Sequence, residues 1–190
     1  FDTTGGYDPN IDKPNIRLGG MIFTGTEQSR TISGSNPLNF YGFNDGGVNY
    51  MIKNDTGFDQ TFTNSEINLY NDQTISTNAQ IVFDDKVNFR NSQQKLHVTG
   101  TGGVTFNDNV NINSTKFEFS NSGTNTVNTH FNSVQELKLN GGGTTVFNGN
   151  VTVNNTQTII EDCDTVGIFN ATFNSNSLLV KDGGTAIFSG

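Results

Sequence analysis

The sequence predicts an all-β fold of the solenoid type, in which short strands stack in successive coils. Three observations support this prediction: a repeat at a fixed spacing, apolar residues that alternate with polar ones, and glycine clusters that recur in register. In a chain of equivalent units, each unit buries its apolar face against the units before and after it, so such repeats usually form rods. We therefore expect an elongated scaffold, and the repeat itself does not name a ligand.

The repeat recurs at a constant interval from Leu96 onward, and we call this interval, from Leu96 to Leu137 and from Leu137 to Leu178, the long period. Each of these positions starts an apolar segment, followed by a glycine cluster and then by a phenylalanine. The segments are Leu96-His97-Val98, Leu137-Lys138-Leu139 and Leu178-Leu179-Val180, and the phenylalanines are Phe106, Phe147 and Phe188. A related segment begins at Phe83, close to half a long period before Phe106. One coil, or rung, is therefore predicted to hold roughly 20–23 residues, within the range of β-solenoids.

The local pattern within each repeat predicts strands that have one inward face and one solvated face. Val104, Phe106 and Val110 alternate with polar residues at a period of two. The glycine clusters within 100–103 and 141–143 are expected to form tight corners, because glycine tolerates positive φ. An apolar stripe with the period of an α-helix is missing, so we expect little or no helix.

Composition indicates what fills the core and what covers the surface. Only 32% of the residues are hydrophobic and Trp is absent, whereas there are 16 Phe and 4 Tyr, so Phe is the expected core residue. If the rungs stack in register, equivalent residues lie about 4.8 Å apart, and Asn side chains can form hydrogen-bonded ladders along the axis. Such ladders account for much of the Asn content without any binding site.

The two ends of the chain are expected to differ from its middle. Pro9, Pro14 and Pro37 all lie in the first fifth of the sequence, and proline cannot donate a hydrogen bond to a strand ladder. We predict an N-terminal arm or cap over residues 1–20, with a first strand at Ile16-Arg17-Leu18, and a solenoid over residues 21–190. The sequence stops at Gly190 within a repeat, which predicts either a piece of a longer protein or an end that stacks on another subunit.

The repeat resembles the autotransporter-associated β-strand repeat of bacterial surface proteins. The pattern of that family is an apolar strand, a glycine corner, a second strand and another glycine, and it is similar to residues 137–149 and 180–190. A weaker copy begins at Leu38, so the resemblance covers roughly residues 30–190. It implies a right-handed parallel β-helix outside a bacterial cell, as an autotransporter passenger or part of a larger surface protein. The resemblance implies no catalytic residues, and this sequence shows no counterpart of the translocator barrel of intact autotransporters.

Charge and cysteine content exclude several classes of protein. The formal net charge of -8 repels a phosphate backbone, so nucleic acid is not an expected partner. No stretch approaches the roughly 18 apolar residues of a membrane span. The single cysteine, Cys163, excludes an internal disulfide framework and is expected to be a small buried residue in an apolar strand. The chain begins with Phe1, which is consistent with processing and removal of a secretory leader.

Two acidic clusters are the candidates for carbohydrate chemistry, because glycosidases and lyases on parallel β-helices need paired carboxylates or acids beside a basic residue. One is Asp84-Asp85, with Lys86 and Arg90 close in sequence, and the other lies at residues 161–164. Acidic residues at corners are usually solvated. Because no second cluster recurs one rung away in the sequence, we do not expect a catalytic site here.

Histidine and tyrosine side chains are the remaining candidates. His97 and His130 are expected to be outward-facing polar residues of strands. Tyr41, Tyr50 and Tyr70 can be read as an aromatic platform for sugars or, as we favour, as edge or cap aromatics. The sequence thus assigns no catalytic, cofactor-binding or metal-binding residue.

The functional hypothesis from the sequence is a non-enzymatic, extracellular β-solenoid that serves as a surface scaffold, coat or filament subunit of a bacterial cell. Self-association through the solenoid ends or the N-terminal arm, and adhesion to a surface glycan or a host or cell-surface partner, belong to this hypothesis. The alternative is a β-helix protein that binds or degrades carbohydrate.

Overall fold

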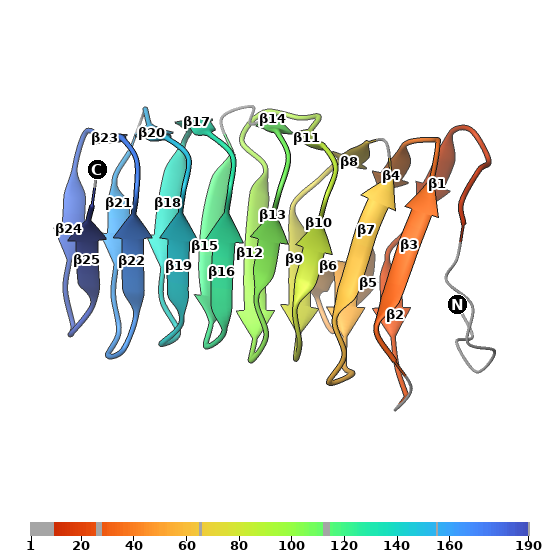
Figure 1. The fold of residues 1–190 in the computed structure, drawn as a ribbon, viewed down its shortest axis with the longest axis horizontal. Coiled ribbons are helices and arrows are strands. Elements are labelled where there is room, and N and C mark those ends of the chain that lie inside the picture. The colour runs from red at the N-terminus through yellow and green to blue at the C-terminus, as the bar shows by residue number, and fades with distance from the viewer. Residues whose placement is uncertain (1–9, 26–27, 65, 112–114, 155, 190) are drawn as a thin grey trace.

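The computed structural model describes residues 10–25, 28–64, 66–111, 115–154 and 156–189, and this part of the chain is all β, without helix. The strands wind into a solenoid that is elongated from its N-terminal to its C-terminal end (Figure 1). All pairings between successive rungs are parallel, and the predicted all-β solenoid is thereby confirmed. Residues 1–9, which hold much of the predicted N-terminal arm, lie outside the described residues.

Two long sheets form two walls of the solenoid. Sheet A has eight strands: β3 (Arg30–Gly34), β7 (Gln60–Asn64), β10 (Ile81–Phe83), β13 (Val104–Phe106), β16 (Thr124–Val127), β19 (Thr144–Phe147), β22 (Val166–Phe169) and β25 (Thr185–Phe188). Sheet C stacks β2 (Met21–Phe23), β6 (Val48–Asn54), β9 (Gln73–Thr77), β12 (Lys95–Gly100), β15 (Lys116–Asn121), β18 (Glu136–Leu139), β21 (Thr158–Ile160) and β24 (Leu178–Val180).

The third wall is divided between two shorter sheets. Sheet B contains β1 (Ile16–Leu18), β4 (Leu38–Phe40), β8 (Ile67–Leu69), β11 (Val87–Phe89) and β14 (Val110–Asn111), and sheet D contains β17 (Phe131–Val134), β20 (Val151–Val153) and β23 (Phe173–Ser175). The expected first strand at Ile16–Leu18 is confirmed, and it pairs with β4, so stacked strands already begin within residues 1–20.

The long period corresponds to two rungs. Leu96 pairs with Phe117, and Phe117 pairs with Leu137, so one period spans two steps along sheet C. The predicted rung of half the period is therefore confirmed for this part of the chain. Two rungs fall outside the predicted range: the step from Val166 to Thr185 in sheet A is slightly shorter, and the step from Arg30 to Gln60 is much longer.

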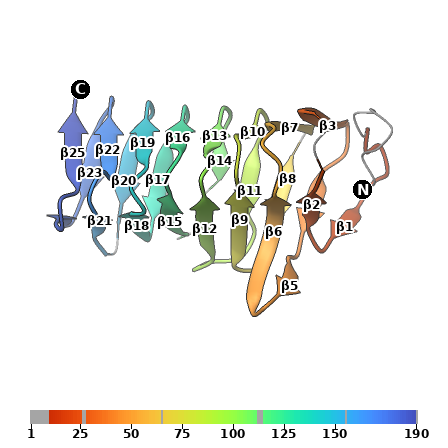
Figure 2. The same ribbon diagram turned by 90° about the horizontal axis from the view of Figure 1, so that it is seen from below.

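The rung that begins at Arg30 is long because it contains a β-hairpin. Strand β5 (Phe43–Asp45) pairs antiparallel with the first part of β6, and Gly46 and Gly47 turn between them with φ of 59° and 87°. The hairpin extends beyond the neighbouring strands on one side of the solenoid (Figure 2). A two-residue Gly-Gly turn between two strands is a known hairpin signal, and it marks this insertion in the sequence.

Phenylalanine rings stack along the inner side of sheet A, which confirms Phe as the recurring core residue. Their centroids lie 5.1–5.3 Å apart within each run, the separation of offset-stacked rings. The two runs are Phe62, Phe83 and Phe106, and Phe147, Phe169 and Phe188.

A ring from another wall joins the two phenylalanine runs. Val127 occupies the intervening position in sheet A, since it pairs with both Phe106 and Phe147. Phe131 on β17 fills the space that the smaller side chain leaves, with ring centroids 6.1 Å from Phe106 and 5.8 Å from Phe147. The aromatic core is therefore continuous from Phe62 to the last rung.

Asparagine side chains form the ladders expected from the sequence. One ladder is solvent-exposed and follows the ends of the sheet A strands, with each Nδ2 donating to the preceding Oδ1 at 2.7–2.8 Å; its members are Asp84, Asn107, Asn128, Asn148 and Asn170. A second ladder runs along sheet B through Asn39, Asn68, Asn88 and Asn111 at 2.7–3.1 Å. Side-chain hydrogen bonds thus run parallel to the backbone ladders.

Several corners bring the backbones of successive rungs into close contact. A Cβ atom added at Gly102 would overlap the backbone carbonyl of Ala79 in the preceding rung. Gly141 lies at φ 86° and its position is similarly crowded by Ser120. These glycines are required by the approach of neighbouring rungs, as the recurring clusters predicted.

We predict that Gly102→Ala destabilises the protein by about 1–3 kcal/mol, because the added methyl group must displace the backbone of the adjacent rung. Gly57→Ala is the matched control, since no atom lies within 4 Å of a Cβ at that site and its φ lies outside the left-handed region. Urea unfolding of both variants measures the difference. Equal losses of stability would contradict the close approach at this corner.

Truncation of the ring that joins the two phenylalanine runs is expected to be costly. Phe131→Ala should lower the free energy of unfolding by about 3–5 kcal/mol, because Phe131 is fully buried between neighbouring rungs. Phe188→Ala removes an equivalent ring that is 51% exposed and should cost much less. Denaturant titrations of the two variants test this order, and the reverse order would refute it.

Candidate functional site

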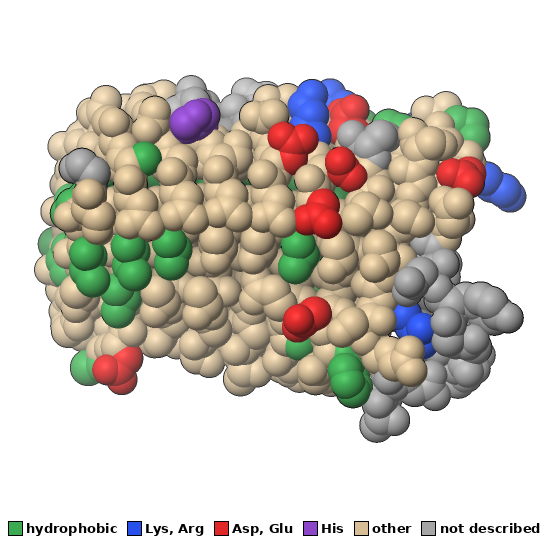
Figure 3. All heavy atoms as spheres, in the orientation of Figure 1, with side chains coloured by type: hydrophobic (Ala, Val, Ile, Leu, Met, Phe, Trp, Pro, Cys, Tyr) green, Lys and Arg blue, Asp and Glu red, His purple; other side chains and the backbone are tan. Residues whose placement is uncertain are grey.

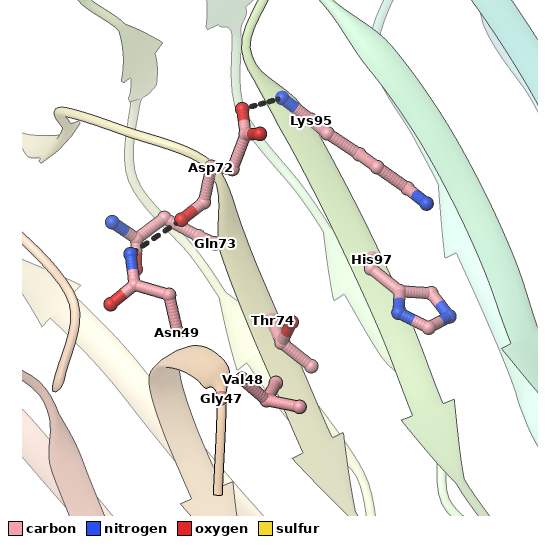
Figure 4. Close-up of a pocket in the computed structure, with 8 residues that line it drawn as sticks. All are labelled: Gly47, Val48, Asn49, Asp72, Gln73, Thr74, Lys95 and His97. Carbon is pink, nitrogen blue, oxygen red and sulfur yellow. Dashed lines mark hydrogen bonds between the residues drawn. The ribbon is translucent and has the colours of Figure 1, made fainter. Parts of the chain in front are cut away.

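A cleft of about 290 Å³ lies beside the β5–β6 hairpin. Gly47, Val48 and Asn49 form its hairpin side. The opposite side comes from residues 72–74 at the start of β9 and from Lys95 and His97 on β12; all of these residues are drawn in Figure 4. The cleft exists because the inserted hairpin lengthens β6 beyond the width of its neighbours.

Asp72 connects the three elements that border the cleft. The Nδ2 of Asn49 donates to the Asp72 carbonyl at 2.7 Å, and the backbone nitrogen of Lys95 donates to the Asp72 carboxylate at 2.8 Å (Figure 4). The carboxylate therefore already serves a structural hydrogen bond. This hydrogen bond makes the Asp72 carboxylate less available to act as a general base.

Two polar side chains bordering the cleft lack protein partners for some of their atoms. Gln73 is only 2% exposed, and neither its amide nitrogen nor its amide oxygen is hydrogen-bonded. It occupies an inward position, since it pairs with Leu96. His97 is half-buried, and its Nε2 also lacks a partner. Unpaired buried polar atoms cost free energy, so the Nε2 of His97 favours a polar ligand or water at this border of the cleft, whereas the amide of Gln73 faces the interior.

His97 lies on the outer face of sheet C, as expected from the sequence, but between charged neighbours. Burial lowers the pKa of His97 below its ordinary value, Glu118 opposes this, and Lys95 and Lys138 act in the same direction as burial. Folding therefore favours the neutral form of the imidazole relative to the unfolded chain. No hydrogen bond links its Nε2 to an acid or a hydroxyl group, so a nucleophile-histidine-acid arrangement is not formed at that atom.

Charged side chains of alternating sign run beside His97 along sheet C. Lys95 pairs with Glu118, which lies 3.8 Å from Lys138, and Lys138 in turn lies 2.5 Å from Glu161. Lys181 extends the row, with its Nζ 2.7 Å from Glu161. We call these five residues the ion ladder. Sequence reasoning missed it, although its members recur once per rung with alternating charge.

The ion ladder keeps its carboxylates ionised. Burial by itself raises the pKa of Glu118, but Lys95, His97 and Lys138 outweigh burial and hold that pKa below its ordinary value. The pKa of Glu161 is lowered mainly by its hydrogen bonds with Lys138 and Lys181. Carboxylates that are held ionised in this way are poor general acids, and the arrangement connects successive rungs instead.

The two predicted acidic clusters lie on different rungs. Asp84 and Asp85 follow β10, whereas residues 161–164 follow β21, and four steps along sheet A separate β10 from β22. The two clusters therefore do not form a carboxylate pair. Arg90 lies apart from the first cluster, with its side chain bonded to Asn68 and Glu66, and Lys86 is half-exposed just before β11.

The first acidic cluster has one further acidic neighbour, which was not named from the sequence. Phe83 pairs with Phe106, so Asp108 of the next rung lies beside Asp85. Burial raises the pKa of Asp85, and the charges of Asp108 and Asp84 raise it further. The sequence alone hides this neighbour because Asp108 stands one full rung later. Among the described residues, no group of three or more His, Cys, Asp or Glu side chains is arranged to hold a metal ion.

The structure also corrects the prediction for Cys163. The thiol is exposed in a turn between β21 and β22, and it is not part of an apolar strand. Asp162 and Asp164 on either side adopt positive φ of 76° and 68°, which directs the chain around the corner. The flanking acidic residues were the sequence signal for a turn. Cys163 contacts the carbonyl of Asp182 at 3.7 Å.

The three candidate tyrosines are partly exposed, and each packs against another aromatic ring. Tyr41 and Tyr70 stack on each other at 4.6 Å with an interplanar angle of 3°, and the guanidinium of Arg17 lies 5.6 Å from the Tyr41 ring. Tyr50 packs against Phe43 within the hairpin.

The second histidine has a structural hydrogen bond. His130 lies just before β17, and its Nδ1 accepts a hydrogen bond of 2.9 Å from the backbone nitrogen of Asn150 in the next rung. The side chain is exposed, as expected from the sequence. It contributes to the contact between two rungs and lies far along the rod from the cleft that His97 borders.

Comparisons with known proteins identify no relative. No protein-family model matches the chain, and neither a curated protein nor a solved structure is significantly similar to it. The resemblance to the autotransporter-associated repeat therefore stays a prediction. No helix in the described ranges is long and apolar enough to cross a membrane.

The half-buried imidazole of His97 leads to a prediction about how the stability of the protein depends on pH. Because the pKa of His97 is lowered by folding, the unfolded chain takes up the proton first as the pH falls through about 6.5, and stability is lost below that pH. The wild type should lose stability more steeply between about pH 7.5 and 5.5 than His97→Gln. The difference should stay well below the roughly 1.4 kcal/mol per pH unit set by one full proton.

Urea titrations at several pH values measure this difference. The two proteins should show parallel stability curves above neutral pH, which serves as the internal control. Curves that remain parallel throughout the acidic range would show that burial does not affect His97.

Proposed function

We propose that this chain is a structural protein: a rigid, non-enzymatic β-solenoid that serves as a surface scaffold, coat or filament subunit outside a bacterial cell. The observation that carries the proposal is that its recurring side chains contact the equivalent positions of neighbouring rungs. The phenylalanine runs, the asparagine ladders and the ion ladder all run along the axis. Side chains used in this way hold rungs together and maintain the length of the rod.

The chemistry of the candidate residues supports a structural role over catalysis. A hydrolase of the glycosidase type needs two carboxyl groups across one substrate, one of them protonated. The two predicted acidic clusters are separated along the rod, and the carboxylates of the ion ladder are held ionised by lysines. The extracellular, bacterial surface location belongs to this proposal and is supported by the family resemblance in residues 137–149.

The two ends of the rod support a further part of the proposal, association in the direction of the axis. At the described N-terminal end, Ile11 is buried and its backbone nitrogen donates to the Ser33 carbonyl, so this end of sheet A is covered. In the last described rung, by contrast, Leu178, Val180 and Phe188 are exposed. Apolar strands that have no neighbour favour stacking against a further rung, whether from the same chain or from another subunit.

Exchange of one long period tests the structural role. Residues 96–136 and 137–177 each span one long period, so the first segment can be replaced by a second copy of the other without a change in length. If the chain is a scaffold, the exchange variant should fold and should build a surface layer of unchanged thickness, because the length of the rod and the stacking of its rungs decide its function. Deletion of residues 96–136 should instead shorten the rod by two rungs, about 10 Å.

The readouts are circular dichroism of the purified variants and thin-section electron microscopy of cells that display them. A folded exchange variant that no longer supports the surface layer would contradict the proposal, since particular side chains within residues 96–136 would then matter more than length.

A second candidate function is the binding of carbohydrate in the cleft, which the unpaired Nε2 of His97 favours. A glycan array and a reducing-sugar assay test it with the wild type. Binding that His97→Ala removes would support this candidate, and turnover that Asp84→Asn or Asp162→Asn abolishes would favour an enzyme. The scaffold proposal expects neither.

A further inference from the structure

The outer face of sheet A differs from the other walls in its side chains. One column of equivalent positions crosses all eight strands, and every member is a β-branched residue without charge. Backbone pairing aligns Thr31, Thr61, Val82, Thr105, Thr126, Val146, Ile168 and Ile187. The uniform column extends over the whole described length of the wall.

A second column of the same kind lies beside the first in the C-terminal half. Its members, which precede those of the first column by two positions on each strand, are Thr124, Thr144, Val166 and Thr185. In Figure 3, hydrophobic side chains gather over β19, β22 and β25 on this side of the molecule. We call the two columns together the β-branched face.

The character of the β-branched face is not a general property of the outer surface. The equivalent outward column of sheet C carries His97, Glu118 and Lys138, and the ion ladder follows it. β-Branched residues favour strands on any wall, so strand propensity alone does not explain why the outward column of sheet A lacks charge over eight strands. The two columns themselves contain no charged side chain, although the net charge of the chain is -8.

We propose that the β-branched face is an interface on which a second copy of this chain packs side by side, sheet against sheet. Val, Ile and Thr have few side-chain rotamers, so a column of them loses little entropy when it is buried. Two sheets that pack face to face interdigitate their side chains about 10 Å apart. The inference concerns how the proposed scaffold associates laterally, and therefore rests on the proposed function.

The spacing of the rungs is the argument for a second copy over another occupant. Side chains of the face repeat at the rung distance of about 4.8 Å, and a second copy necessarily has the same repeat. Identical uncharged columns can then interdigitate without electrostatic repulsion, as in dry interfaces between stacked sheets. Interfaces with unrelated proteins are enriched instead in Tyr, Trp and Arg, which the two columns lack.

The size of the face sets the strength of the contact. The first column spans eight rungs, about 34 Å, and the second spans four rungs, about 14 Å, and each column is about 7 Å wide. A pair would therefore bury roughly 700 Å² in total, below the range of standard specific interfaces. A single pair is expected to be weak in solution. Chains fixed to one surface would associate far more strongly, because attachment raises their effective concentration.

Lysine substitutions at matched positions test the interface. Thr126→Lys places a charge in the middle of the β-branched face, whereas Thr99→Lys places the same charge on the outer face of sheet C. A third variant, Val180→Lys, alters an inward position that is exposed at the end of the last described rung. In sedimentation equilibrium at rising concentration, Thr126→Lys should weaken dimerisation at least tenfold, and the other two variants should dimerise like the wild type. Circular dichroism verifies that all are folded.

Cysteine crosslinking gives an independent readout. In a Cys163→Ser background, Thr126→Cys should form disulfide-linked dimers on mild oxidation, and Thr99→Cys should form few. A wild type that stays monomeric at every concentration overturns the inference. Dimerisation that is lost in Val180→Lys but kept in Thr126→Lys also overturns it, because that result would indicate end-to-end contact.

The same variants separate this inference from two related conclusions. A monomer whose β-branched face slows ice growth, with the effect lost in Thr126→Lys, would overturn the inference and assign the face to the ordered lattice of water. The structural role itself is tested by exchange of residues 96–136, which leaves Val146, Ile168 and Ile187 in place. Failure of lateral association therefore leaves the scaffold proposal standing, and failure of the exchange variant counts against the scaffold alone.

Discussion

In-register stacking of parallel strands is the constraint on which the rest of this structure depends. Once each residue lies beside its equivalent in the next rung, a single side-chain type at one position becomes a column along the axis. Phenylalanine then forms an aromatic core, asparagine forms hydrogen-bonded ladders, and alternating lysine and glutamate form the ion ladder. Every residue gains partners that lie one rung away in sequence and are nevertheless its nearest neighbours in space. A rod with few hydrophobic residues can be stable in this way, because each rung is buried on two sides.

Departures from the repeat occur where neighbouring rungs can compensate. Val127 interrupts the phenylalanine run, and Phe131 from the third wall fills the space, close to where sheet B gives way to sheet D. The hairpin at β5 and β6 adds residues on the outside of one rung and leaves the pairing of Ile52 with Ile75 intact. The cleft beside it, with the unpaired polar atoms of His97 and Gln73, results from this insertion. The hairpin, where the repeat is interrupted, is therefore the part of the rod that most favours binding of a ligand.

The repeat made much of the fold predictable. The spacing of Leu96, Leu137 and Leu178 indicates equivalent strands, and the phenylalanines that follow them indicate the core. Contacts between side chains of neighbouring rungs were harder to predict from the sequence, because a shift of one residue in register moves a side chain to the other face of the sheet. Asp108 was therefore not recognised as a neighbour of Asp85, and the ion ladder was missed although its spacing is regular. Cys163 was assigned to a strand because its hydrophobic character was weighted above the acidic residues that turn the chain around it.

Native-state hydrogen exchange tests most directly whether each rung is stabilised by its neighbours along the axis. The account predicts that backbone amides in the central strands, such as β12, β13 and β16, are the most protected, and that protection declines toward both ends of the described solenoid. Amides of the walls should follow the same gradient, because one rung contributes to all three. Protection that is uniform along the rod, or greatest in the last rung at β24 and β25, would contradict the claim that axial stacking holds this structure together.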